Sequence, residues 1–271
     1  MVMTFLGLNP FAWVALVAVA MTVLLLADAL AGHYRSGFVS RAQYAPFLSG
    51  GLLVVFAVIA VVMPDASWAN TALRGVGWGA VATGIVGFGF HHYYGITKKP
   101  GGYRWLLHYL MYGAPQLAPL ALAVMGALSL IAARGMAGET GVAGLGLRPA
   151  LFAVIAVALA GAILQAGILH YRGAFNNAAM YAPMTVPLLA VISSLWVLVA
   201  PSPAALIALA ILLWLTLLTG FIGLGMHLRG FDRQMGGLYV ALFNLLEGPP
   251  AWAPALFAGF AAVGLMAVYL L

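Results

Sequence analysis

The sequence contains no cysteine in its 271 residues, and only 6% of the residues are charged. Without cysteine the chain can form no disulfide, thiolate zinc site or iron–sulfur cluster, and it has no thiol nucleophile. Soluble globular domains carry about 25% charged residues, so the composition excludes a soluble enzyme. The 11 Lys and Arg residues are too few and too scattered to follow a phosphate backbone, which excludes a nucleic-acid partner.

Long apolar segments take up most of the chain, and 65% of its residues are hydrophobic. A helix that spans a bilayer needs about 20 mostly apolar residues. The sequence therefore predicts an all-α integral membrane protein, surrounded by the lipid bilayer, with about eight transmembrane helices. The apolar runs lie near residues 11–32, 48–64, 76–94, 115–133, 150–170, 183–200, 204–227 and 251–271.

The basic residues are distributed unequally between the two sets of loops. The loops after the first, third, fifth and seventh runs hold eight of the 11 Lys and Arg residues, and the other side holds three. Cytoplasmic loops carry the excess of Lys and Arg. We therefore expect the first set of loops to face the cytoplasm across a bacterial inner membrane, with both termini outside.

Two loops of the sequence repeat one another. The segment GHYRSGFVSRAQYAP begins at Gly32, and LHYRGAFNNAAMYAP begins at Leu169. In both, an Arg follows the His by two positions, a Phe by five, a Tyr by eleven and a Pro by thirteen. The two histidines, His33 and His170, are 137 positions apart, about half the length of the chain.

A second correspondence follows at nearly the same spacing. His92 and His227 lie 135 positions apart, and the next loops match at that same spacing: Gly101, Gly113 and Pro115 pair with Gly236, Gly248 and Pro250. The sequence thus predicts a duplicated four-helix unit, with repeats at 1–135 and 136–271. Four spans per repeat give both halves one orientation, so we expect a pseudo-two-fold axis along the membrane normal.

The four repeated histidines are candidate haem ligands. A b-type haem takes two neutral imidazoles from facing helices, and His33, His92, His170 and His227 are all expected at one level on the cytoplasmic side. Small residues such as Gly87 and Gly223 precede them in the sequence, and we expect these to make room for the flat ring. Three arginines lie near them and are candidates to meet the haem propionates: Arg35, Arg172 and Arg229.

Two other interpretations fit the same histidines. A helix that leaves the bilayer favours an aromatic residue and a cation at headgroup level, so His-Tyr-Arg can be a turn and membrane-interface anchor copied by duplication. The histidines can also be ligands of a bare copper, iron or zinc ion, although adjacent residues such as His91 and His92 cannot both face one site from a helix.

Two polar side chains lie inside predicted spans at matching positions. Asp28 is five residues before His33, and Gln165 is five residues before His170. A charged group in the membrane is costly and is expected to face the bundle interior or a wet cavity. These residues can relay protons, bind a quinone or cation, or bond to a neighbouring helix.

No catalytic triad, phosphate loop or zinc motif occurs in the sequence. We therefore expect a non-catalytic membrane subunit of an electron-transfer assembly, which binds haem b, contacts partner subunits and exchanges electrons with quinone. The alternatives are a small transporter that uses Asp28, and a cofactor-free scaffold of a larger complex. The amphipathic segments 103–112 and 228–250 are expected to form short helices at the membrane surface.

Overall fold

The fold consists almost entirely of helices. The computed structural model describes residues 6–234, 236–248 and 250–271, and ten α-helices lie within these ranges. The predicted all-α fold is confirmed. Eight of the ten helices have 17 or more residues: α1 (Pro10–Arg35), α2 (Ala45–Val62), α3 (Ser67–His92), α5 (Ala118–Met136), α6 (Leu147–Arg172), α7 (Ala182–Val199), α8 (Pro203–Asp232) and α10 (Ala253–Tyr269).

Seven of these helices, all except α10, are long and apolar enough to cross a bilayer. The chain is therefore an integral membrane protein. Helix α10 is equally apolar but has 17 residues, about 25 Å at the rise of an α-helix, whereas the hydrocarbon core is about 30 Å thick. An eighth span thus stays a prediction.

Proline marks the start of most of the long helices. Six of the eight carry a proline at their first or second position, namely α1, α2, α5, α7, α8 and α10. The first N–H groups of a helix have no acceptor within it, so proline loses nothing there and already has the helical φ angle. The predicted starts of these six helices lie close to the observed ones, whereas α3, which has no such proline, begins at Ser67, well before its predicted start at 76.

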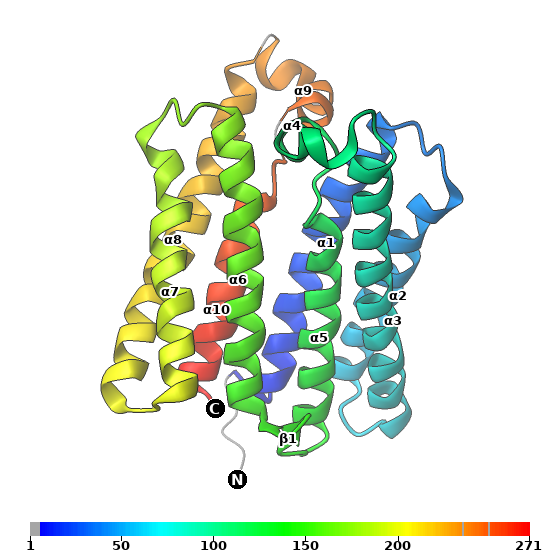
Figure 1. Cartoon of the computed structure of the whole chain (residues 1–271). Coiled ribbons are helices and arrows are strands. Elements are labelled where there is room, and N and C mark those ends of the chain that lie inside the picture. The colour runs from blue at the N-terminus through cyan, green and yellow to red at the C-terminus, as the bar shows by residue number, and fades with distance from the viewer. Residues whose placement is uncertain (1–5, 235, 249) are drawn as a thin grey trace.

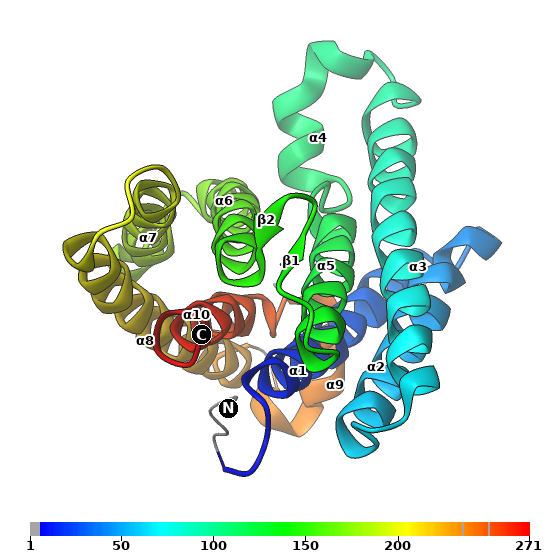
Figure 2. The ribbon, with the colours of Figure 1, turned by 90° about the horizontal axis from the view of Figure 1, so that it is seen from below.

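The long helices form two bundles of four. In the first bundle, α1 contacts α2, α2 contacts α3, α3 contacts α5, and α5 contacts α1. The second bundle closes the same cycle with α6, α7, α8 and α10. The bundles meet where α1 contacts α10 and α5 contacts α6, so these four helices lie at the centre, with α2–α3 and α7–α8 outside (Figure 2).

The two ends of the molecule differ. Two short helices, α4 (Leu106–Tyr112) and α9 (Ala241–Glu247), both lie at the same end of the molecule, which we call the α4/α9 end (Figure 1). They occupy the segments expected to form short helices. At the opposite end, a β-hairpin of β1 (Gly141–Val142) and β2 (Leu145–Gly146) joins α5 to α6. We call this the hairpin end.

The elements of the two bundles follow one another in the same order. Helices α1 and α6 have 26 residues each, α2 and α7 have 18 each, and α4 and α9 have seven each. Helices α3 and α8 have 26 and 30 residues, and α5 and α10 have 19 and 17.

Glycine brings the backbones of α3 and α5, and of α8 and α10, into close contact. A Cβ atom at Gly84 would lie 2.6 Å from the backbone nitrogen of Ala123, and one at Gly220 would lie 2.6 Å from that of Ala258. No side chain fits at that distance, so only glycine allows the approach, as is common between membrane helices.

Candidate functional site

Histidines from the long helices gather at the α4/α9 end. His33 lies in the last turn of α1 and His170 in the last turn of α6, while His91 and His92 end α3. His227 lies near the end of α8. All five are partly buried, and the helices that carry them end beside α4 and α9 (Figure 1).

In the first bundle, His33 pairs with His91. Their ring centroids are 6.2 Å apart, and the ring planes are perpendicular. Helices α1 and α3 are opposite members of the four-helix cycle, so the pair reaches across the interior of the bundle. Phe38 and Phe47 also contact the His33 ring, with centroids 6.0 and 6.2 Å away.

In the second bundle, His170 and His227 come from the corresponding helices, α6 and α8. They lie near enough to interact electrostatically. The structure therefore places two histidine pairs at one end of the molecule, each between opposite helices of its own bundle. We call these the first pair (His33 and His91) and the second pair (His170 and His227).

Backbone carbonyls fix three of these four imidazoles. Nδ1 of His91 lies 2.9 Å from the carbonyl oxygen of Pro115, and Nδ1 of His227 lies 3.0 Å from that of Pro250. Nδ1 of His170 is 3.1 Å from the carbonyl oxygen of Met180. A carbonyl can only accept a hydrogen bond, so Nδ1 carries the hydrogen and Nε2 of a neutral ring is left with a free lone pair. Metal-bound histidines are oriented in this way.

The structure assigns His92 a different place from the one that the sequence spacing indicates. Nε2 of His92 shares a hydrogen bond of 2.5 Å with the hydroxyl of Tyr103, and the structural counterpart of His227 is His91. One additional residue in the chain after these histidines explains the difference. Helix α3 continues into a π-helical segment, Tyr93–Thr97, and a π-helix accommodates one residue more than an α-helix. The loop spacing of 135 therefore misaligned the helix by one position.

The repeated spacing around His33 and His170 forms two similar turns. Phe38 and Phe175, five positions after the histidines, have positive φ angles of 48° and 46°. Phe38 stacks on Tyr44 at a centroid distance of 4.7 Å, and Phe175 stacks on Tyr181 at 4.6 Å. Stacking holds a backbone conformation that non-glycine residues rarely adopt. The Phe and Tyr of the sequence repeat thus have a structural role.

The three arginines near the histidines are exposed. The guanidinium of Arg172 lies 5.1 Å from the ring centroid of Tyr112 in α4, a cation–π contact between the bundles. Arg35 and Arg229 lie in the last turns of α1 and α8. Contact of these residues with propionates stays a prediction.

Two of the glycines expected to make room for a flat ring serve helix packing instead. A Cβ at Gly87 would lie 3.0 Å from Cβ of Pro119, and one at Gly223 would lie 3.1 Å from Cβ of Pro254. Both glycines therefore pack against the start of a neighbouring helix, Gly87 against α5 and Gly223 against α10.

Asp28 and Gln165 bond to backbone groups of the opposite bundle. The Asp28 carboxylate in α1 accepts hydrogen bonds from the backbone N–H groups of Trp252 and Ala251, at the start of α10. Oε1 of Gln165 in α6 accepts one from the N–H of Leu117, at the start of α5, at 3.1 Å. Of the roles expected for these residues, the bonds support attachment to a neighbouring helix.

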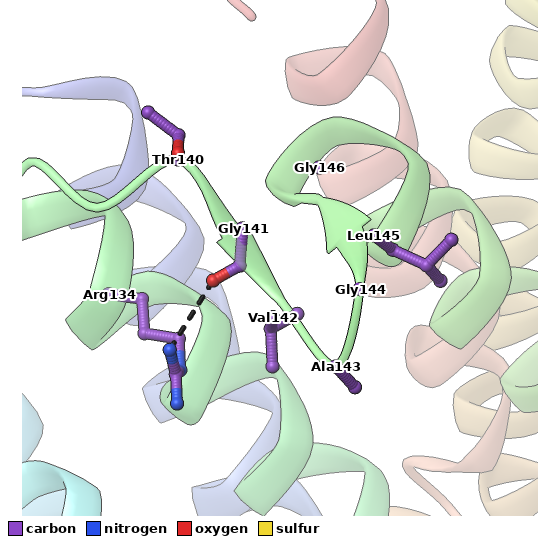
Figure 3. A pocket seen from close by; sticks show the side chains of 8 residues that line it. All are labelled: Arg134, Thr140, Gly141, Val142, Ala143, Gly144, Leu145 and Gly146. Carbon is purple, nitrogen blue, oxygen red and sulfur yellow. Dashed lines mark hydrogen bonds between the residues drawn. The ribbon is translucent and has the colours of Figure 1, made fainter.

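A depression of about 410 Å³ lies at the hairpin end, outside the predicted sites (Figure 3). It is lined by Arg134 and residues 140–146. Arg134 donates a hydrogen bond to the carbonyl of Gly141 at 3.3 Å and pairs with Glu139. The charge of the one basic lining residue is thus already paired.

Within the described ranges, no group of three or more His, Cys, Asp or Glu side chains is arranged to hold a metal ion. The bare-metal interpretation therefore lacks a sufficient set of ligands there. No protein family matches the chain, and no curated protein or solved structure matches it.

The sequence alone did not reveal the part that His91 and the carbonyls of Pro115, Pro250 and Met180 play. For two of these carbonyls, those of Pro115 and Pro250, the sequence does contain a signal. Gly113 and Gly248, two positions before the prolines, recur at the spacing of the repeat. A Cβ at Gly113 would lie 2.5 Å from the carbonyl oxygen of Tyr109, so the turn requires glycine there.

Proposed function

We propose that the protein is a membrane subunit of an electron-transfer assembly that holds one b-type haem in each bundle. The axial ligands are His33 with His91, and His170 with His227. The observation that carries the proposal is the geometry of the first pair, in which imidazoles from opposite helices lie with their ring centroids 6.2 Å apart, together with the carbonyls that hold Nδ1 of three of the four rings.

The separation in the first pair suits a shared metal centre. Two imidazoles that bind one ion from opposite sides, with metal–nitrogen distances of about 2 Å, have ring centroids roughly 6 Å apart. The centroids of His33 and His91 are 6.2 Å apart. Nε2 of His91 is the nitrogen left for a metal, because its Nδ1 bonds to Pro115.

The number of ligands favours a tetrapyrrole over a bare ion. A structural or catalytic zinc site needs three or four protein ligands, whereas each pair supplies two. A haem contributes four nitrogen donors of its own and needs only axial ligands from the protein. A haem held by two histidines would have no position left for a substrate, and its role would be to carry electrons.

We propose that the two bundles arose as a duplicated four-helix unit, related by a pseudo-two-fold axis along the membrane normal. The shared order of elements, the two similar turns after His33 and His170, and the glycine contacts of Gly84 and Gly220 support this. Both sites then lie on the same side of the membrane, and the basic loops favour the cytoplasmic side. α10 is the eighth span, and both termini lie outside.

Quinone is the electron carrier that dissolves in the bilayer, and it is the partner we propose for both haems. The reduced carrier, quinol, would release two electrons and two protons as it becomes quinone, and the electrons would pass through the haems to a partner subunit at the cytoplasmic face. The exposed aromatic residues of the α4/α9 end, such as Tyr103, Trp105 and Tyr239, suit the interface between headgroups and a bound protein.

An absorption spectrum of the detergent-purified protein, oxidised and then reduced with dithionite, tests this function. We expect a Soret band and an α-band that sharpens on reduction. His91→Leu is expected to remove about half of the bound haem, because the second pair keeps its two ligands. His92→Leu, at the adjacent position, is the matched control and is expected to keep all of it.

A flat visible spectrum, obtained from cells supplied with haem, overturns the proposal and leaves a cofactor-free scaffold. Loss of haem in His92→Leu with retention in His91→Leu overturns the assignment of the ligands.

A further inference from the structure

Two side chains, one from each bundle, form hydrogen bonds to the backbone of the other bundle. Asp28 of the first bundle binds the backbone at the start of α10 in the second, and Gln165 of the second bundle binds the backbone at the start of α5 in the first. The two side chains occupy matching positions, each five residues before a histidine of its own helix.

The backbone segment that each side chain holds also carries a carbonyl that orients a histidine. Leu117, which donates to Gln165, is two residues after Pro115, whose carbonyl accepts from His91. Trp252, which donates to Asp28, is two residues after Pro250, whose carbonyl accepts from His227. Each of the two side chains is thus connected, through a short backbone segment, to a histidine of the other bundle.

The connection between the two bonds is short and tightly packed. In the first bundle it consists of Pro115, Gln116 and Leu117. Gln116 is buried, and its Nε2 donates to the carbonyl of Ala114 at 3.0 Å. Gln116 also packs against Gly95, where a Cβ would lie 2.7 Å from Nε2. A segment packed in this way transmits a displacement of Leu117 to the Pro115 carbonyl, because interiors are dense and do not absorb it.

We propose that Gln165 and Asp28 are positioning residues, and that each orients the histidine of the opposite bundle: Gln165 orients His91, and Asp28 orients His227. The two pairs are therefore coupled across the interface. The importance of this coupling for electron transfer rests on the proposed function, whereas the orientation of the rings does not require a cofactor.

A different role, simple attachment of one bundle to the other, predicts another pattern. If the two bonds only held the bundles together, loss of either one would affect both histidines alike. The positioning role predicts a crosswise pattern, in which loss of one bond changes the histidine on the far side of the interface and leaves the other pair unchanged.

Nitrogen-15 NMR of the histidine rings distinguishes the two patterns. The full-length chain is labelled with ¹⁵N-histidine in iron-limited cells, so that Nε2 is free, and the signals are assigned by replacing each histidine in turn. In the wild type, we expect His91 and His227 to show the single tautomer with hydrogen on Nδ1. In Gln165→Met, which has a similar length, His91 is expected to lose this signature while His227 keeps it.

Asp28→Leu is expected to give the opposite result, loss at His227 and retention at His91. Gln165→Glu and Asp28→Asn keep an oxygen acceptor, and both controls are expected to retain the wild-type signals. If Gln165→Met does not fold, Gln165→Leu replaces it, and Asp28→Ala similarly replaces Asp28→Leu. Change at both histidines, at neither, or at the one on the same side overturns the inference.

The two proposals fail separately. A flat visible spectrum together with the crosswise NMR pattern overturns the haem and leaves the positioning role. A haem spectrum with no crosswise pattern overturns the positioning role alone.

Discussion

Glu139 links two helices of the first bundle at the hairpin end through one carboxylate. Its oxygens pair with Arg74 of α3 at 2.5 Å and with Arg134 of α5 at 2.7 Å. The hydrogen bond from Arg74 is the largest of the effects that lower the pKa of Glu139 below the usual glutamate range, and Arg134 contributes in the same direction. The group is exposed, so solvent and salt screen these attractions.

These ion pairs predict a small, pH-dependent contribution to stability. The pKa of Glu139 is lower in the folded protein than in the unfolded chain, so the contribution is fully present at neutral pH. It is lost as the pH falls through the folded-state pKa. We expect Glu139→Gln to unfold at a slightly lower temperature than the wild type at pH 7 and low salt, and the difference to be smaller at pH 3.

Thermal unfolding in detergent at the two pH values measures this difference. Asp65→Asn removes an acidic group in the loop before α3 without touching these ion pairs, and serves as the control. A deficit of Glu139→Gln that is as large at pH 3 as at pH 7 would show that the ion pairs are not its cause.

At the scale of helices, the contacts between α3 and α5 and between α8 and α10 depend on glycine at one position each. A Cβ atom added at Gly84 would lie 2.6 Å from the backbone nitrogen of Ala123 and 2.7 Å from the carbonyl oxygen of Pro119. Both atoms belong to the backbone of α5, so neither can rotate away, and the two helices have to move apart.

We therefore expect Gly84→Ala to destabilise the protein by about 1–3 kcal/mol, the usual effect of overpacking a dense interior. Gly89→Ala, in the same helix, meets nothing within 4 Å and is expected to leave stability unchanged or slightly raised. Measuring the unfolding temperatures of the two variants compares their stabilities. Equal temperatures would contradict the close approach of α3 and α5.

The sequence predicted the helices well and their mutual contacts poorly. Apolar runs and initial prolines placed α7 near its observed bounds, because both signals are local. The sequence spacing matched His92 with His227, whereas the structure places His91 beside His33, because the π-helical segment 93–97 changes the register without changing the composition. The bonds of Asp28 and Gln165 were beyond prediction, since their partners are backbone groups that only the packed bundles bring together.

At the scale of the whole molecule, the two ends carry different charges. The basic loop residues lie mainly at the α4/α9 end, with the histidine pairs, and the hairpin end has few. From the positive-inside rule, we expect both histidine pairs to face the cytoplasm.

The absence of cysteine allows a direct test of this orientation. Val39 is 84% exposed at the α4/α9 end and Leu145 is 46% exposed at the hairpin end. In inside-out membrane vesicles, we expect a membrane-impermeant thiol reagent to label Val39→Cys and to leave Leu145→Cys unlabelled, and the reverse in right-side-out vesicles. The wild-type chain gives no background, and the opposite pattern would invert the topology.

The π-helical segment after His92 also bears on how the sequence can change over evolutionary time. An extra residue inside a regular α-helix rotates everything beyond it by about 100°. Here the extra residue is taken up between His91 and the turn at Gly101, so both keep the places of their counterparts, His227 and Gly236. Insertions and deletions among descendants of this chain are therefore expected to be tolerated in that one turn and selected against elsewhere in the helix.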